Sequence, residues 1–409
     1  MPNFSIPLSG LTASDTALAT ISNNLANLNT TGYKDTTVNF QDLFYNLLGS
    51  NGSGDQLQVG SGASVASIGT NFTNGSVQNT GVNTDVAISG NGFFVVQNGS
   101  NTYYTRAGDF TTDANGYLVT ADGYQVMGYP AVNGVVNTSG GLAPIQIDSG
   151  MISPPTATSN VSIQANLSSD AAVGDSYNTS VTVYDSLGSA HVVSIDFTRT
   201  ASGWNYNATL PSSDITGGSG TNTSVGSGSL SFDSSGNLTS TTPIAFNVSP
   251  LADGAAPLAF NWDLANAGGT GLITQVSGDS GTTSTSQDGN SSGTLTGFSI
   301  NTDGTITGAF TNGSETIGQI ALANFSNLQG LTKEGSNNYS ATISSGSAVV
   351  GAPGSGSLGS LTGNALELSN VDMSTEFTNL IVAERGFQAN AKSVTTFDQI
   401  AQDTINLIR

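Results

Sequence analysis

The only histidine of the chain, His191, is the first residue to consider for chemistry, because a Ser-His-Asp triad or a histidine metal site would have to use it. It lies at one end of a strand-like run, and no G-x-S-x-G motif is near it. The chain has no cysteine, which excludes disulfides, thiolate nucleophiles and cysteine metal sites. We therefore expect His191 to be a surface residue, and we expect no catalytic residue, metal or cofactor.

Aspartates are the other candidates for chemistry. Asp113 to Gly116 and Asp233 to Gly236 resemble fragments of calcium loops, but neither has the ligand spacing that ends in glutamate. Both lie between strand-like runs, where Asp and Asn favour turns, so we predict turns there. A carboxylate pair for glycoside hydrolysis stays open, since any two acids can meet in space, but the sequence marks no particular pair. Gly90 to Gly92 lacks the third glycine and the following helix of a phosphate-binding loop.

The charge composition excludes several classes of function. The 409 residues include 7 Lys+Arg and 28 Asp+Glu, a net charge of −21, and only 9% of residues are charged. So few cations argue against binding to nucleic acid or to anionic lipid. No apolar run is long enough for a transmembrane helix, and the first cation is Lys34, so the pattern of a cleaved signal peptide is missing. We expect a cytoplasmic chain or one exported without signal cleavage.

Both ends of the chain have helical periodicity. From residue 8 to residue 29, Leu11, Leu18 and Leu25 form one series spaced by seven, and Ser14, Ile21 and Leu28 form a second, offset by three. This a/d pattern is typical of a coiled coil and predicts a helix that ends before Gly32.

The C-terminal segment predicts a longer helix, from an Asn364 and Glu367 capping pair to Arg409. Its first series is Met373, Leu380, Phe387, Val394, Ala401 and Ile408, and its second is Phe377, Glu384, Ala391, Asp398 and Ile405. At about 64 Å against about 33 Å, this helix is too long for the N-terminal one to cover. An intramolecular helical hairpin is one interpretation, and an assembly module whose apolar stripe needs a neighbour is the other, which we favour.

The middle of the chain reads as antiparallel β structure. Strand-like runs at 93–96, 102–105, 117–120, 181–184, 192–195 and 317–322 are punctuated by turn dipeptides such as Asn98-Gly99, Asn115-Gly116 and Asp122-Gly123. Residues 146–290 hold 11 Asp, no Glu and one cation, Arg199, which indicates a separate inserted β domain. The segments 49–62 and 351–363 are rich in Gly and Ser and are candidate hinges between the terminal helices and the β region, with these glycines: Gly49, Gly52, Gly54, Gly60, Gly62, Gly351, Gly354 and Gly356.

Several motifs resemble a known family. Residues 10–34 carry an N-terminal signature with Asn23, Asn24, Asn27, Asn29, Gly32 and Tyr33, and residues 365–373, with Ser369 and Asn370, and 383–390 carry a C-terminal one. Residues 85–94 and 104–110 are similar to a shared β domain. Together they resemble the bacterial flagellar rod and hook axial proteins. The extra block 146–290 is similar in size to the outer domain of the hook members, which the distal rod members lack.

The resemblance implies a multidomain, mainly antiparallel β protein with barrel- or sandwich-like domains and N- and C-terminal helices that pair as a coiled coil. It implies an inner-tube domain at 1–32 plus 365–409, a connecting region at 33–72 plus 351–364, a middle β domain at 73–145 plus 291–350, and an outer β domain at 146–290. The terminal helices would polymerise through Leu11, Leu18, Ile21, Leu25, Leu28, Met373, Phe377, Leu380, Phe387, Val394 and Ile405.

The function that the resemblance implies is structural, not enzymatic. It is a helical homopolymer that forms the curved hook tube and transmits torque from rod to filament. The implied partners are further copies of the chain, the rod, the hook cap, the hook-filament junction proteins and the type III export apparatus. Export without signal cleavage would place the chain outside the cell. The alternatives are a distal rod-type protein and a secreted β-rich adhesin or glycan-binding protein.

Overall fold

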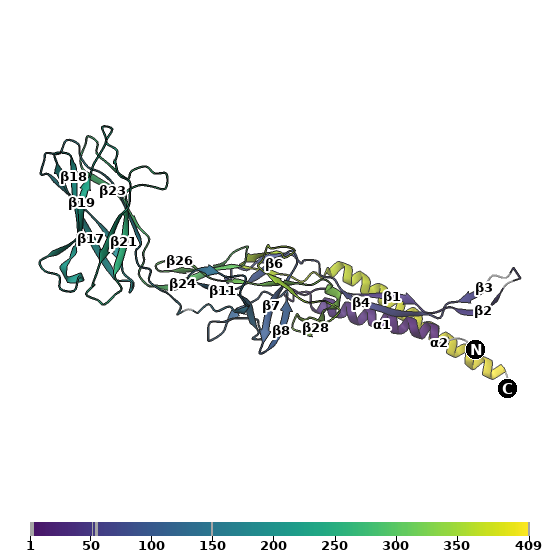
Figure 1. Cartoon of the computed structure of the whole chain (residues 1–409). Helices are drawn as coiled ribbons and strands as arrows, with labels where there is room; N and C mark the ends of the chain where they lie inside the picture. Colours follow the sequence, from purple (N-terminus) through teal and green to yellow (C-terminus); the bar gives the residue numbers. More distant parts are fainter. Residues whose placement is uncertain (1–3, 51, 54–55, 149, 408–409) are drawn as a thin grey trace. The chain divides into compact units, whose positions relative to one another are not determined.

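The computed structural model describes residues 4–50, 52–53, 56–148 and 150–407. The chain divides into two compact units (Figure 1). Unit 1 comprises Met1–Ser149, Phe298–Gly308 and Glu315–Arg409, and unit 2 comprises Gly150–Gly297 and Ala309–Ser314.

The terminal helices of unit 1 are α1 (Ser5–Ala26) and α2 (Met373–Leu407). They pack against each other along α1 (Figure 1), and the contacts run in opposite directions along the two chains: Phe4 with Phe397, Gly10 with Asn390, Ser14 with Gly386, and Asn24 with Glu376. The prediction of paired terminal helices flanking antiparallel β structure is therefore confirmed.

The predicted start of the C-terminal helix is wrong. Asn364 has a left-handed backbone with φ of 57°, and the residues after it form a strand, β32 (Ala365–Glu367), which pairs with β5 (Val77–Asn79). Asp372 caps α2 instead, since its Oδ1 accepts a hydrogen bond from Thr375 N at 2.8 Å. The 35 residues of α2 span about 52 Å, still longer than α1. At the other end α1 stops at Ala26, so Leu28 lies in the following turn.

Short antiparallel pairs connect the helices of unit 1 to its main sheet. The pair β1 and β4 runs beside α1, and the β2–β3 hairpin extends from it (Figure 1). The bounds are β1 (Thr36–Asp42), β2 (Asn46–Ser50), β3 (Gln56–Val59), β4 (Ala63–Thr70), β6 (Val86–Ser89) and β31 (Ser360–Gly363), the last two paired with each other.

In the main sheet of unit 1, β26, β11, β7, β8, β29 and β28 follow one another. Their bounds are β26 (Gly313–Ile320), β11 (Gln125–Val132), β7 (Phe93–Asn98), β8 (Asn101–Thr105), β29 (Asn338–Ser340) and β28 (Thr332–Gly335). Smaller strands and one turn of 3-10 helix complete this region: β9 (Thr111–Thr112), β10 (Leu118–Val119), β12 (Val135–Val136), β13 (Ala143–Pro144), β27 (Leu322–Asn324), η2 (Leu328–Gly330) and β30 (Val349–Gly351). Interlocking aromatics fill the core, among them Phe93, Tyr104, Phe325 and Tyr339. The boundary between the units passes through β24 (Gly293–Ile300), β25 (Thr305–Phe310) and β26.

Unit 2 contains two sheets around one core. One has the order β16 (Ser176–Tyr184), β17 (Ala190–Thr200), β18 (Gly203–Pro211) and β19 (Asn222–Leu230). The other has the order β20 (Ile244–Val248), β21 (Leu258–Asp263), β15 (Asn160–Asn166) and β22 (Ile273–Thr274), with β23 (Gly281–Gln287) also on β15. β14 (Ile152–Ser153) and η1 (Ser212–Asp214) complete the unit. Alternating side chains of β16 and β17 point into a core that also buries Trp204 and Trp262.

The turn predictions are confirmed. Gly99, Gly116 and Gly123 all have positive φ. Asp113 Oδ1 accepts hydrogen bonds from the backbone N–H groups of Asn115 and Tyr117, as expected of a turn residue. Asp233 Oδ1 accepts equivalent bonds from the two corresponding backbone N–H groups of its own turn. In the described part of the chain, neither helix is long and apolar enough to cross a membrane.

Candidate assembly surface

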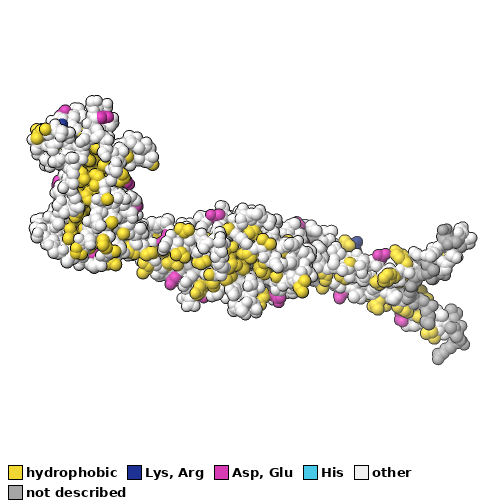
Figure 2. Space-filling model, in the orientation of Figure 1, with side chains coloured by type: hydrophobic (Ala, Val, Ile, Leu, Met, Phe, Trp, Pro, Cys, Tyr) yellow, Lys and Arg dark blue, Asp and Glu magenta, His cyan; other side chains and the backbone are white. Residues whose placement is uncertain are grey.

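Helix α2 exposes large apolar side chains. Six of them are between 46% and 66% exposed: Met373, Phe377, Ile381, Val382, Ile400 and Ile405. Figure 2 shows hydrophobic side chains at the surface of the helical part of unit 1. An isolated exposed apolar residue is ordinary, but Met373, Phe377 and Ile381 are spaced by four and form a row along one side of α2, which is typical of a surface that is covered by a partner.

The seam between α1 and α2 uses only part of the predicted pattern. Leu11, Leu18, Ile21 and Leu25 of α1 and Leu380, Phe387 and Val394 of α2 are half-buried. The second α2 series is displaced by one residue, because Glu376, Asn390 and Phe397 contact α1 whereas Phe377 and Ile405 are exposed. Met373, Phe377 and Ile405 therefore lie where the helix pair of one chain leaves them uncovered.

The signature asparagines form the junction between α1 and the β structure, and Asn24 is its fully buried centre. Its Oδ1 accepts from Thr36 N at 3.0 Å and from Tyr33 Oη at 3.2 Å, and its Nδ2 donates to Thr36 O at 2.8 Å and to Glu376 Oε1 at 3.2 Å. Asn23 Nδ2 donates to Tyr33 Oη at 3.0 Å. A buried amide with all its bonds made fixes the angle at which the chain leaves α1.

The remaining signature residues extend this junction. Gly32 has a φ of +66°, and a Cβ on it would lie 2.7 Å from the backbone N of Ala107, so only glycine fits. Asn370 Oδ1 accepts from Asp35 N at 2.7 Å, while its Nδ2 donates to Asn71 O at 2.9 Å. Local bonds are made by Asn27 Nδ2, which donates to Asn23 O, and by Ser369 Oγ, which accepts from Val371 N; Asn29 is exposed.

A buried ion cluster beside the junction is absent from the sequence predictions. Glu367 Oε1 accepts from Lys34 Nζ at 2.7 Å, and Glu367 Oε2 accepts from Arg106 Nη1 at 3.2 Å. Burial lowers the pKa of Lys34 and of Arg106, and the charge and hydrogen bonds of Glu367 oppose that shift. In sequence, the only signal is that Lys34 and Arg106 lie inside recognisable motifs, as Arg385 also does.

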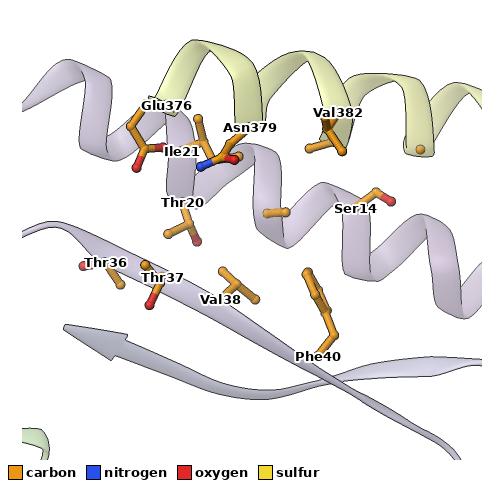
Figure 3. Close-up of a pocket in the computed structure, with 13 residues that line it drawn as sticks. Ser14, Thr20, Ile21, Thr36, Thr37, Val38, Phe40, Glu376, Asn379 and Val382 are labelled. Atoms are coloured by element: carbon orange, nitrogen blue, oxygen red, sulfur yellow. The ribbon is translucent and has the colours of Figure 1, made fainter. Parts of the chain in front are cut away.

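A groove lies between α1, α2 and β1 (Figure 3). Its volume is about 520 Å³, and its walls include Ala17, Ile21, Val38, Val382 and Ala383. Glu376 lies at one end of the residues labelled along α2 in Figure 3, and its Oε2 is buried without a hydrogen-bond partner. Burial, which is the main cause, and the nearby charge of Asp35 raise the pKa of Glu376. Ser14, Thr20, Thr36, Thr37 and Asn379 also line it, so the groove has both apolar and hydrogen-bonding walls and one unsatisfied carboxyl oxygen.

Comparisons with known proteins identify the family. The flagellar hook protein FlgE of Escherichia coli K12 is 40% identical over 99% of both chains. The FlgE proteins of Salmonella typhimurium and Treponema pallidum are 38% and 36% identical, over 98% or more of each chain. The chain belongs to the flagellar hook protein family.

Family models match the hook protein in four places. They describe a flagella basal body rod protein at residues 6–34, a hook protein FlgE/F/G D1 domain at 87–166, a FlaE D2 domain at 156–290 and a rod FlgEFG C-terminal region at 362–407. A crystal structure of Helicobacter pylori flagellar hook protein FlgE2 has the same fold, with a TM-score of 0.51 at 17% identity over 71% of this chain and 99% of that one. Because the full-length relatives are hook proteins, the distal rod and adhesin alternatives are not favoured.

The candidate hinge glycines of this hook protein lie in different surroundings. Gly49, with φ of +136°, belongs to β2, Gly52 to the turn after it, and Gly60 follows β3; Gly54 is outside the described residues. Gly62 packs against α1, since a Cβ on it would overlap Ser9 Oγ. Gly351 is paired in β30, and Gly354 and Gly356 form a turn. The expectation that 351–363 adjoins the C-terminal helix is wrong, because the segment itself ends in β31, and β32 follows it before Met373.

The prediction that His191 is a surface residue is also wrong. It is 5% exposed in unit 2, with Nδ1 at 2.9 Å from Asp214 Oδ2 and Nε2 at 3.1 Å from Asp185 Oδ2. Burial lowers the pKa of His191, but the hydrogen bonds and charges of the two aspartates outweigh it and raise that pKa. Both ring nitrogens lie within hydrogen-bond distance of these carboxylates. His191 therefore links the segments that carry Asp185 and Asp214, and neither nitrogen is free to act as a base.

Proposed function

We propose that this chain is the structural subunit of the flagellar hook and polymerises through its paired terminal helices into the curved tube that links rod to filament. The observation that carries this proposal is the full-length similarity to hook proteins. The exposed apolar row on α2 supports it, because a chain whose own fold leaves such a row uncovered gains from burying it against further copies.

Electron microscopy of the purified chain under assembly conditions tests the proposal. Curved tubes of uniform width are the expected result, and the double variant Phe377→Ser/Ile381→Ser should form fewer of them. Val173→Ser is a matched control, since Val173 is 71% exposed but lies in unit 2. Soluble monomers under every condition, or tubes that are indifferent to the α2 substitutions, would contradict assembly through this helix.

In a flexible joint, each region of the chain would then have a different role. In this proposal residues 1–32 and 365–409 line the inner tube, 73–145 with 291–350 form the middle domain, and 146–290 form the outer domain. Few charged side chains suit surfaces that slide, because polar groups and water exchange contacts without breaking strong ion pairs. The segments 33–72 and 351–364 connect these regions.

Flexing would take place at the connecting glycines. A Cβ on Gly49 or Gly52 would meet no atom within 4 Å, and one on Gly60 would meet only Tyr45 at an ordinary 3.7 Å, whereas Gly62 is packed on α1. Alanine at Gly52 and Gly60 should stiffen the hook and impair swimming while hooks still assemble, whereas Gly49, with its φ of +136°, does not admit proline and would be strained by alanine. Normal bending in these variants would remove the hinge role from the 49–62 segment.

Its family implies association with the flagellar rod. We further propose contacts with the hook cap and the hook-filament junction proteins, and export through the flagellar type III apparatus without signal cleavage. A chain without cysteine suits passage through a narrow channel, since no disulfide has to be avoided before export. The expected function is mechanical, so we infer no enzymatic activity. Mass spectrometry of the N-terminus of hooks isolated from cells tests export without cleavage.

A further inference from the structure

The groove between α1, α2 and β1 has the chemistry of a receptor for one long cationic side chain. Its walls combine apolar side chains such as Ile21 and Val382 with the polar side chains of Ser14, Thr20, Thr36, Thr37 and Asn379, and a buried carboxyl oxygen, Glu376 Oε2, has no partner there. Glu376 itself is 6% exposed, and its other oxygen is already bonded to Asn24. An arginine or lysine combines an apolar stem with a charged end, and so matches both features.

A second buried acid oxygen lies near the same end of the groove. Asp35 Oδ1 has no partner, and Asp35 precedes Thr36, which lines the groove. The charge of Asp35 contributes to the raised pKa of Glu376, which indicates that the two carboxyl groups are close enough to repel each other. A cation that enters the groove would offset the cost of burying the Glu376 carboxylate and would reduce the repulsion between Glu376 and Asp35.

Most cationic side chains of the described residues already have a partner within the chain. Lys34 and Arg106 bind Glu367, Arg199 donates to Gly203 O in unit 2, and Lys333 donates to Thr36 Oγ1. Within the described ranges, two cations remain without a side-chain partner: Arg385 and Lys392, which are exposed on α2 and seven residues apart.

We propose that the groove binds Arg385 of a second copy of this chain, whose guanidinium pairs with Glu376. A planar guanidinium donates two parallel hydrogen bonds to a carboxylate, which favours Arg385 over Lys392. Within one chain the pair is excluded, because residues 376 and 385 are about 13 Å apart along α2, farther than one arginine side chain spans.

The contact is heterologous, since the groove and Arg385 are different parts of the surface. Each copy offers one groove and one arginine, so the contact repeats from copy to copy and generates an open filament when the rotation between copies does not close a ring. This inference rests on the proposed self-assembly and adds the pair of residues that determines register between neighbouring copies.

The test measures the concentration of full-length chain that stays soluble when polymer is pelleted. Arg385→Ala and Glu376→Gln should each raise it at least tenfold, and the double variant should be no worse than the more damaging single change, since both remove one interaction. Lys392→Ala and Glu384→Gln are matched controls on exposed positions of the same helix, and each should change it less than twofold. Circular dichroism of the Arg385→Ala monomer should be unchanged, because the Arg385 side chain is exposed and has no ion pair within the described part of its own chain.

Cross-linking identifies the neighbour directly, because the native chain has no cysteine. Chains with Arg385→Cys and chains with Val382→Cys, carrying different tags, are assembled together and oxidised. Disulfide-linked heterodimers in the polymer are expected, since Val382 is in the groove wall. Polymer without them, or an Arg385→Ala variant that assembles as the wild type does, would overturn the groove contact and leave the hook function standing. Failure of the wild type to polymerise would instead overturn the proposed function and this inference with it.

Discussion

At the scale of single residues, Glu367 is the one anion between two buried cations. Lys34 and Arg106 are 0% and 3% exposed, and their remaining bonds go mainly to backbone carbonyls. Glu367→Gln removes the carboxylate that pairs with both cations and should lower the free energy of unfolding of unit 1 by about 3–5 kcal/mol. Chemical denaturation followed by circular dichroism at 222 nm measures this. Glu384→Gln, on the exposed side of α2, should stay within about 0.5 kcal/mol of the wild type.

His191 makes the stability of unit 2 depend on pH. Its raised pKa means that the imidazolium is favoured in the folded state, so its contribution is complete below pH 6.5, the ordinary value, and is lost as pH rises through the raised pKa. Burial opposes ionisation of Asp185, but hydrogen bonds from its surroundings, His191 among them, hold its pKa at about 2, so that contribution fails only in strong acid.

The measurement is the melting temperature of unit 2 between pH 5.5 and 9, which should fall with increasing pH. His191→Gln has no titrating ring and should flatten the profile over this range. A profile that is equally steep in the variant would assign the pH dependence to other groups.

At the scale of elements, alanine substitutions at two glycines of the helix seam distinguish the effect of close packing from the effect of helix propensity. A Cβ on Gly10 would lie 2.7 Å from Asn390 Nδ2, whereas one on Gly386 would meet Ser14 Oγ at an ordinary 3.5 Å. Alanine favours a helix interior by about 0.5–1 kcal/mol over glycine. Gly386→Ala should therefore stabilise the helix pair, and Gly10→Ala should destabilise it because Asn390 has to move. Denaturation followed at 222 nm gives both signs, and equal gains at the two positions would refute the close approach at Gly10.

Elements were predictable from sequence where local signals agree with tertiary contacts. The heptads of the two ends and the Asn-Gly and Asp-Gly turns located helices and hairpins, because periodicity and positive φ are local properties. The start of α2 could not be predicted from sequence, since Glu367 satisfies a capping pattern there but pairs with Lys34 and Arg106 in the structure. The contacts of His191 were missed for the same reason, because Asp214 comes from another strand connection.

At the scale of the whole molecule, the two units have separate cores and should unfold separately. Both tryptophans, Trp204 and Trp262, are buried in the core of unit 2, while both described α-helices belong to unit 1. Tryptophan fluorescence therefore reports on unit 2, and the 222 nm signal reports mainly on unit 1. We expect two transitions at different temperatures in one thermal scan of the full chain.

Two variants show which unit gives rise to each of the two unfolding transitions. Glu367→Gln should shift the 222 nm transition and leave the fluorescence transition in place, and His191→Gln should do the reverse. Coincident transitions that move together in both variants would mean that the chain unfolds as one cooperative body. Independent unfolding is what a segmented joint requires, because a domain that can move without loosening its neighbour lets a polymer bend while the seam of terminal helices stays intact.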